Sequence, residues 1–197
     1  MAQTKALRDE LADFKKSGKF IYSYADVYSQ KSYYLNSVAN VIYLNPIGEL
    51  EFKGLSTEIM FFKDFQEKSG LKMEIIRHGK YKSAVEPFLE NKMSDANREQ
   101  TTELLNSIWK SVVSEIAVTR KISEKHLNEI ADSLMARSPQ MALKEKLIDK
   151  IAYEDVYHSD IKKVLKIDDN EQTARAYNLI GLNLEQYSDY KKAIYFF

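Results

Sequence analysis

The segment between Arg77 and Phe88 contains a lysine whose position could support catalysis. A predicted strand ends at Gly79, and Lys82 follows just past the turn, beside small and apolar residues. A lysine can accept a proton near neutral pH only if its pKa falls by about 2–3 units from the ordinary value near 10.4. Desolvation in an apolar pocket would have that effect. Because lysine is rarely buried, an exposed ammonium is the simpler interpretation of this segment by itself.

Composition and motif spacing exclude several other chemistries. The 197 residues include no cysteine, which excludes a disulfide framework, a thiol nucleophile and zinc sites with cysteine ligands. The histidines His78, His126 and His158 lack metal-pair spacing, and the chain has no glycine-rich phosphate loop or G-x-S-x-G nucleophile elbow. The 29 basic and 29 acidic residues balance, which argues against a large nucleic-acid-binding surface. We therefore expect no metal, no cofactor and no nucleic-acid partner.

The sequence contains enough apolar residues for a core but no obvious membrane segment. Its hydrophobic fraction is 44%, which is typical of a folded domain. No apolar run approaches the roughly 20 residues that span a bilayer. The charged amino-terminal residues are expected to form a helix and not a signal peptide.

The residues before position 80 predict a layered α/β arrangement. Apolar residues at helical spacing predict helices, and runs of β-branched and aromatic residues predict strands. The expected helices are 3–17, 30–39 and 56–68, and the expected strands are 20–24, 41–44, 49–52 and 73–76. Asn45-Pro46 is expected to end the second strand, since proline cannot donate to a central ladder. Helices that alternate with strands in this way indicate an α/β domain.

The chain after Pro87 is predicted to be helical, because five of the six glycines lie before residue 80. Ser94 is expected to cap a long helix that runs to about Arg120. Ser123 is expected to cap the next helix, and Ser138-Pro139 to begin a third. Residues 155–166 then form a short amphipathic segment.

The last residues differ in character from the rest. The spacing of small and aromatic residues over 174–197 resembles part of one tetratricopeptide repeat. The alternative is an amphipathic helical hairpin that packs on the main domain. We therefore expect one partial domain over residues 1–166, and a linker with a repeat-like helical hairpin over residues 167–197.

A resemblance to a known family gives Lys82 a specific role. The run Gly79–Phe88, with its Tyr-Lys-Ser-Ala-Val-Glu-Pro-Phe sequence, closely resembles the signature of the signal peptide peptidase A (protease IV) family of serine peptidases. Similar segments occur in the same order at 7–19, 33–48 and 93–109, so the resemblance covers roughly residues 4–165. It implies a Clp protease/crotonase-like fold, and specifically the amino-terminal half of a duplicated long-form enzyme.

The resemblance also implies an activity and partners. Members of the family hydrolyse peptide bonds, including those of cleaved signal peptides, with a Ser–Lys dyad in which Lys82 matches the general base. Ser–Lys pairs are variants of the catalytic-triad arrangement. The family further implies a ring-like homo-oligomer, with helices 94–135 as an assembly arm. It also implies a location at the cytoplasmic membrane, with the catalytic part on the extracytoplasmic side and an anchor outside this sequence.

The sequence departs from the family pattern at the position of the nucleophile. Short members have a serine three positions before the tyrosine pair Tyr33-Tyr34, but this chain has Gln30 there. Ser29 is one residue away, which on a helix turns a side chain by about 100°. In the long-form enzymes of the family, the serine comes from the second half of the duplicated chain. The glycine pair that supplies oxyanion donors is expected before residue 1; losing one such donor costs about 3–4 kcal/mol of transition-state stabilisation.

These departures leave more than one function open. We expect a peptidase fragment that is inactive by itself, with Lys82 facing a cleft bordered by residues 28–34. The alternative is a non-catalytic assembly or protein-interaction module. An acyl-CoA enzyme of the crotonase type would share the fold, but the signature at residues 79–88 belongs to the peptidases.

Overall fold

The computed structural model describes residues 2–71, 73–74 and 83–165 of the chain. Lys82 and the predicted linker and hairpin at 167–197 lie outside the described residues. The chain divides into two compact units. Unit 1 contains residues 1–54 and 112–197, and unit 2 contains Leu55–Ser111. Each unit is described separately below.

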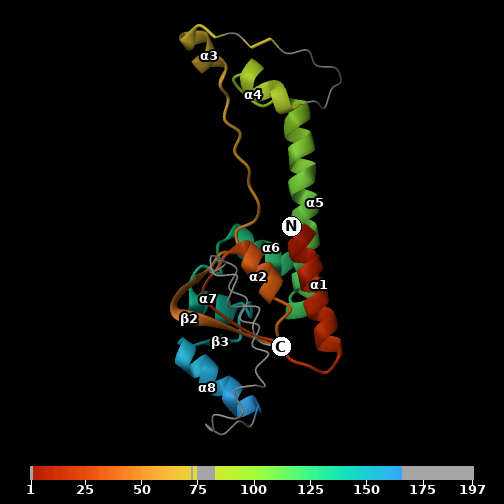
Figure 1. The fold of residues 1–197 in the computed structure, drawn as a ribbon, viewed down its shortest axis with the longest axis vertical. Coiled ribbons are helices and arrows are strands. Elements are labelled where there is room, and N and C mark those ends of the chain that lie inside the picture. Colours follow the sequence, from red (N-terminus) through yellow and green to blue (C-terminus); the bar gives the residue numbers. More distant parts are fainter. Residues whose placement is uncertain (1, 72, 75–82, 166–197) are drawn as a thin grey trace, which may run out of the picture. The chain divides into compact units, whose positions relative to one another are not determined.

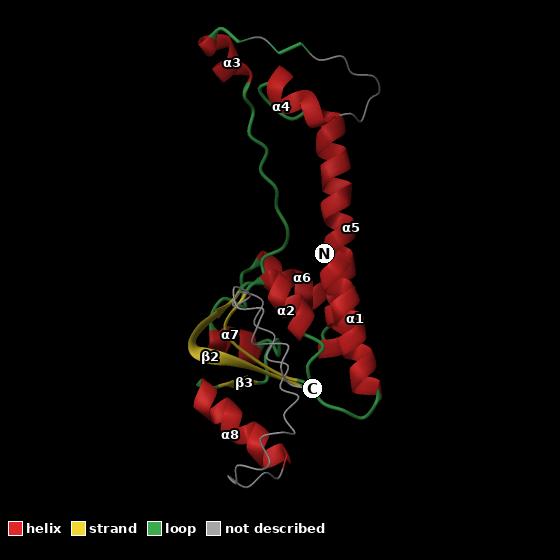
Figure 2. Cartoon of the chain, viewed as in Figure 1, coloured by secondary structure: helices red, strands yellow, loops and turns green. Residues whose placement is uncertain are grey.

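Unit 1 is built on a parallel three-stranded sheet with the order β1-β2-β3 (Figure 2). The strands are β1 (Tyr22–Tyr28), β2 (Val41–Leu50) and β3 (Lys150–Ile151). Helix α2 (Gln30–Asn36) connects β1 to β2, as a parallel pair requires a crossover. Strand β3 comes from a distant part of the sequence, so the sheet joins both segments of unit 1.

Helix α8 (Glu154–Leu165) covers one face of this sheet beside β3 (Figure 1). Tyr43 on β2 packs there in a buried cluster with Ala152, Tyr157 and Ile161. The rings of Tyr43 and Tyr157 meet edge to face, with centroids 5.2 Å apart. Burial raises the pKa of Tyr157 to about 12, so this phenol stays protonated in the neutral range.

The remaining helices of unit 1 complete its apolar core. They are α1 (Ala2–Lys16), the second part of α5 (Asp95–Arg120), α6 (Glu124–Asp132) and α7 (Pro139–Lys144). Their buried side chains include Leu11, Val113, Ile116, Leu127 and Ile130. Caps define the starts of α6 and α7: Ser123 and Ser138 accept hydrogen bonds from His126 N–H and Met141 N–H. The predicted cap at Ser123 and the predicted helix start at Ser138-Pro139 are confirmed.

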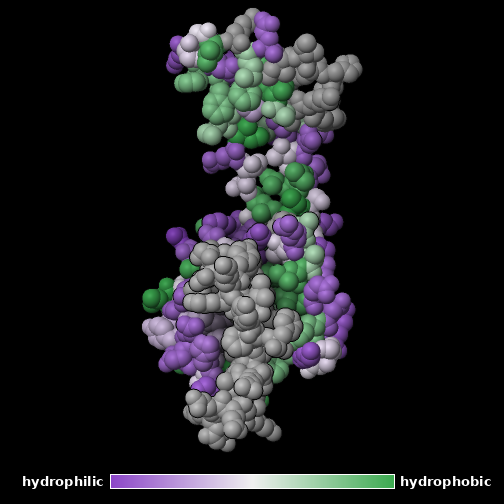
Figure 3. Space-filling model, viewed as in Figure 1, coloured by the Kyte–Doolittle hydropathy of each residue, from purple (hydrophilic) through white to green (hydrophobic). Residues whose placement is uncertain are grey.

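Unit 2 has a different interior. It contains α3 (Lys63–Ser69), a short 3₁₀ helix (Ser83–Val85), α4 (Glu86–Leu89) and the first part of α5. Among its described residues only Glu86 and Asn97 are buried, and no apolar side chain is. Several of its large apolar side chains are exposed: Met60, Phe62, Phe65, Leu71, Met73, Phe88 and Leu104. Figure 3 shows hydrophobic surface on this unit.

The helix predictions are confirmed more closely than the strand predictions. The expected strand 41–44 and residues 49–50 of the strand expected at 49–52 form one strand, β2, in which Pro46 is included. The pairing of β1 with β2 shifts register between Ala25 and Val27. Pro46 lies at this irregularity of the ladder and therefore does not end the strand. A Cβ on Gly48 would lie 2.1 Å from the carbonyl oxygen of Asp26, so the strands approach closely there.

Other predicted boundaries need correction. The helix expected at 56–68 begins only at Lys63, and the preceding residues have no regular structure. Met73 and Glu74 are not in a strand, and the rest of the strand predicted at 73–76 is outside the described residues. Strand β3 was not predicted, because a two-residue strand carries too little pattern in the sequence. Within the described part of the chain, no helix is long and apolar enough to cross a membrane.

Candidate functional site

The first turn of α2 includes the position where the family pattern places a serine. Ser29 is the N-cap of this helix, with its hydroxyl accepting a hydrogen bond from Ser32 N–H at 3.3 Å. The same hydroxyl donates to Ser32 Oγ at 3.0 Å. Ser29 therefore has a structural role as a cap, which explains why a serine occurs one residue from the expected position.

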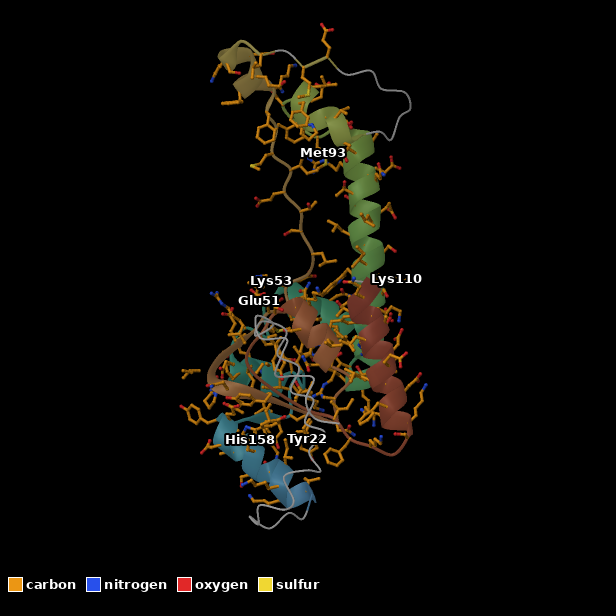
Figure 4. All side chains as sticks on the ribbon, in the orientation of Figure 1. Tyr22, Glu51, Lys53, Met93, Lys110 and His158 are labelled. Carbon is orange, nitrogen blue, oxygen red and sulfur yellow. The ribbon has the colours of Figure 1, made fainter. Side chains whose placement is uncertain are left out.

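Gln30 uses its side-chain amide to bind the main chain just after β2. Its Oε1 accepts from the N–H groups of Lys53 and Gly54 at 2.9 and 3.0 Å, and its Nε2 donates to the Gly54 carbonyl at 2.8 Å. Gly54 has a φ of +83°, a conformation that glycine adopts without steric cost. Figure 4 labels Lys53 and Glu51, which pair at 2.8 Å in this segment. Gln30 thus fixes the point where the chain leaves unit 1.

Helix α2 is anchored in the core by a pair of tyrosines. Tyr33 is buried and donates its hydroxyl to the Leu147 carbonyl at 2.8 Å. Tyr34 is also buried and donates to Glu115 Oε2 on α5 at 2.7 Å. Burial raises the pKa of both phenols, so each remains a hydrogen-bond donor. Together they hold the helix that presents Gln30.

A buried arginine joins α1, α2 and α5. The guanidinium of Arg8 is 4% exposed and donates to the carbonyls of Tyr34 at 3.0 Å and Glu115 at 3.2 Å. It also donates to Ser37 Oγ and Thr119 Oγ1, and lies 5.1 Å from the centre of the Tyr34 ring. Burial lowers the pKa of this group. Since a buried cation is stable only when its donors are satisfied, Arg8 specifies how these helices pack.

Glu115 compensates the charge of Arg8. Burial tends to raise the pKa of this carboxyl, but hydrogen bonds from Lys5 and Tyr34 outweigh it and the pKa is lowered overall. The Lys5 ammonium lies 2.8 Å from Glu115 Oε1, and Arg8 Nη1 lies 3.8 Å from Oε2. The carboxylate therefore stays charged at neutral pH.

A second ion pair fixes the start of β2. Arg120 donates to Asp149 from Nη2 and Nη1, at 2.9 and 3.0 Å, and Asp149 Oδ2 also accepts from the Ile42 N–H at 2.8 Å. Burial lowers the pKa of Arg120, but pairing with Asp149 outweighs it, so the pKa is raised. The pair ties the end of α5 to the central strand.

The described part of the signature, residues 83–88, belongs to unit 2. Glu86 is 3% exposed and accepts from Ser94 Oγ at 2.5 Å, from Ser94 N–H at 3.2 Å and from Asn97 Nδ2 at 3.0 Å. Ser94 Oγ in turn accepts from Asn97 N–H at 3.2 Å, which confirms Ser94 as the cap of α5. Lys82 itself lies outside the described residues, so its predicted place in a cleft near residues 28–34 stays a prediction.

The other titratable groups of the described residues do not form a metal centre. No group of three or more His, Asp or Glu side chains suited to a metal ion occurs in the described ranges. His126 contacts Glu129 at 3.2 Å and Glu145 at 2.7 Å, and these hydrogen bonds raise its pKa. It connects α6 to the end of α7 at the surface.

Comparison with known proteins identifies the family. The sequence model of peptidase family S49 matches residues 13–168. The chain belongs to peptidase family S49. It is 40% identical to Protease 4 of Haemophilus influenzae over 126 residues, which is 64% of the chain and 20% of that relative. It is 34% identical to Protease 4 of Salmonella typhi over 168 residues, which is 82% of the chain and 26% of the relative.

A plant relative matches over nearly the whole sequence. The chain is 29% identical over 192 residues to the protein named serine protease SPPA, chloroplastic, of Arabidopsis thaliana, which is 96% of the chain and 27% of the relative. The chain therefore spans about a fifth to just over a quarter of the length of these relatives. The predicted family is confirmed.

Sequence reasoning missed the structural roles of Gln30 and Glu86. Gln30 was noted only because it is not a serine. No neighbouring residue in the sequence indicates that its side chain contacts residues 53–54. Glu86 offered a weak signal, since an acidic side chain precedes a predicted N-cap, Ser94, within a short loop. A carboxylate near a helix N-terminus is favourable.

Proposed function

We propose that this chain supplies the general-base lysine, Lys82, of a serine peptidase with a Clp protease/crotonase-like fold. The proposal is supported by the family match over residues 13–168, which includes the complete signature at 79–88. In such a reaction the neutral lysine amine accepts the serine proton while the serine oxygen attacks the peptide carbonyl carbon. The resulting ammonium then gives that proton to the departing amine.

We further propose that the polypeptide of residues 1–197 does not hydrolyse peptides by itself. The observation that carries this proposal is Gln30, whose amide is bound to the main chain at residues 53–54. Gln30 has no nucleophilic atom, and the neighbouring Ser29 hydroxyl is engaged in capping α2. The whole peptidase would act on peptides such as cleaved signal peptides, at the extracytoplasmic side of the cytoplasmic membrane.

Two measurements test these proposals. A fluorogenic peptide assay of residues 1–197 is expected to show no turnover above background. Turnover that Lys82→Ala abolishes and Lys80→Ala preserves would overturn the proposed inactivity. Amine labelling as a function of pH, read by mass spectrometry, is expected to give Lys82 a pKa about 2–3 units below the ordinary lysine value. An ordinary value would contradict the general-base role.

A second candidate function is a non-catalytic assembly module that forms a ring-like homo-oligomer. Its support is the exposed apolar surface of unit 2, where Phe65 is 67% exposed and no described apolar side chain is buried. Sedimentation should show an oligomer that Phe65→Glu dissociates. Ile47→Glu, at an even more exposed apolar site in unit 1, is the control. A monomer at all concentrations would contradict this function.

A further inference from the structure

The segment that joins β2 to α3 is an exposed loop whose middle part has no hydrogen-bond partner among the described residues. Residues 51–62 have no regular secondary structure, and Figure 2 draws them as a loop. Most side chains of residues 55–61 are exposed, and Met60 is 73% exposed. Within the described part of the chain, residues 55–61 form no hydrogen bond. Their peptide groups are therefore accessible from solvent.

Both ends of this loop are fixed by contacts with its main chain. At the first end, the Gln30 side chain binds the main chain of Lys53 and Gly54. At the second end, the Phe62 N–H donates to the Pro87 carbonyl at 2.6 Å. The loop thus stays ordered at its ends while the peptide bonds between them are left unprotected.

This combination distinguishes residues 55–61 from other exposed apolar positions. An endopeptidase has to surround the main chain that it cuts, so it cuts exposed loops in preference to helices and strands. Leu104 is 59% exposed, but it lies within α5, where the main chain must open locally before an enzyme can bind it. An exposed side chain alone is therefore not a cleavage site, whereas residues 55–61 need no opening.

The side chains of the loop indicate which class of endopeptidase it suits. Leu55, Ile59, Met60 and Phe61 are apolar, Glu58 is the one charged residue of 55–61, and this stretch contains no proline. Apolar side chains of this size are the ones that a hydrophobic specificity pocket accepts. The loop thus offers several consecutive bonds to an enzyme with such a pocket.

We propose that residues 55–61 are a processing site, at which an endopeptidase selective for apolar side chains cuts the chain while unit 1 keeps its fold. Water is the co-reactant of the cut. Its hydroxyl is added to the carbonyl carbon and its proton to the nitrogen as the C–N bond breaks, which gives a new carboxyl group and a new amino group. The inference is independent of the proposed role of Lys82.

The two products remain together, because contacts inside unit 1 join the part before the cut to the part after it. Tyr33 donates its hydroxyl to the Leu147 carbonyl at 2.8 Å, and Tyr34 donates to Glu115 at 2.7 Å. Strand β2 also pairs with β3, on the other side of the cut in the sequence. Cleavage therefore yields one nicked protein and not two separate ones.

The test is limited digestion of residues 1–197 with chymotrypsin, with the cuts located by intact mass spectrometry. The first cuts are expected between residues 55 and 62, at least about a hundredfold faster than at Leu104. The triple variant Leu55→Asp/Met60→Asp/Phe61→Asp should slow them by about tenfold or more, because a hydrophobic pocket rejects a carboxylate. Leu104→Asp is the matched control and should leave the rate unchanged.

A second variant shows whether the cut requires unfolding. Ile42 is fully buried in β2, and Ile42→Val should weaken unit 1 slightly. It should speed cuts that depend on unfolding several-fold and leave the rate between residues 55 and 62 unchanged. Gel filtration of the digested protein should give a single peak, which separates into two fragments only in urea.

Three results would contradict the inference. First cuts that fall outside residues 55–62 would overturn the processing site, and so would cuts inside it that Ile42→Val accelerates as strongly as cuts elsewhere. Undiminished cutting of the triple variant would overturn the selectivity for apolar side chains. Fragments that separate without urea would overturn the retained fold of unit 1.

Discussion

The two units of this chain are stabilised in opposite ways. Unit 1 buries large side chains, including Tyr33, Leu35 and Ile42, around a parallel sheet. Unit 2 buries only Glu86 and Asn97 among its described residues and leaves large apolar side chains exposed. Apolar burial contributes about 25 cal/mol per Å², and a net hydrogen bond about 0.5–1.5 kcal/mol. The signature segment thus belongs to the unit whose own described contacts contribute less to stability.

That difference bears on the proposed role of Lys82, because a general base acts only when it is held within reach of the proton it accepts. Polar contacts are directional, so they define a geometry even where little apolar area is buried. In the sequence, the whole of unit 2 is inserted between the two segments of unit 1.

The largest expected effect comes from truncating a core leucine. Leu35→Ala should destabilise the protein by about 2–5 kcal/mol, because it leaves a cavity beside the sheet. Leu104→Ala, on the exposed face of α5 in unit 2, should change stability by less than about 0.5 kcal/mol. Urea unfolding monitored by circular dichroism measures both. Equal losses would remove the contrast between the units.

The next effect concerns the buried arginine. Arg8→Ala should cost about 1.5–3 kcal/mol, since it removes charged hydrogen bonds that join three helices. Arg98→Ala, at an exposed position in unit 2, should be nearly neutral. The same unfolding experiment applies. A neutral Arg8→Ala would show that packing alone holds α1 against α2 and α5.

The stability lost on removing a helix cap should differ between the two units by about 1 kcal/mol or less. Ser94→Ala and Ser123→Ala each remove an N-cap, a change that typically costs about 0.5–2 kcal/mol. Ser94→Ala should cost more, because Ser94 also binds Glu86. Amide hydrogen exchange of residues 83–97 and of residues 123–134 measures the local loss of stability in the two variants. A larger loss at Ser123 would contradict the dependence of unit 2 on polar contacts.

The smallest expected effect is a pH dependence at His126. Its pKa is raised by hydrogen bonds to Glu129 and Glu145, so its stabilising contribution is complete below the unfolded value near 6.5 and is lost as pH rises through the folded value. Glu145→Gln should lower the pKa of His126, as measured by NMR titration. The effect on stability should stay below about 1 kcal/mol, since the His126 side chain is exposed to solvent. An unchanged pKa would show that Glu145 does not act on this histidine.

Sequence reasoning succeeded where the signal is local. The caps at Ser94, Ser123 and Ser138 were predictable because a short side chain binds a backbone group three residues away. It failed where the determinant is distant, as in β3, whose residues Lys150–Ile151 pair with β2. The continuation of β2 through Pro46 likewise depends on the bulged partner strand. For the site, the family signature predicted Lys82, but the partners of Gln30 and Glu86 become visible only in three dimensions.

The division of unit 1 by an inserted segment has a consequence for synthesis on the ribosome. The hydrogen bonds that complete its core reach from residues 33–42 to 147–149. The chain must therefore be made through residues 55–111 before those early partners are satisfied. At about 5–20 residues per second, this takes several seconds, during which β1 and β2 present an unpaired edge. Nascent chains of this protein should accordingly depend on holding chaperones until β3 emerges.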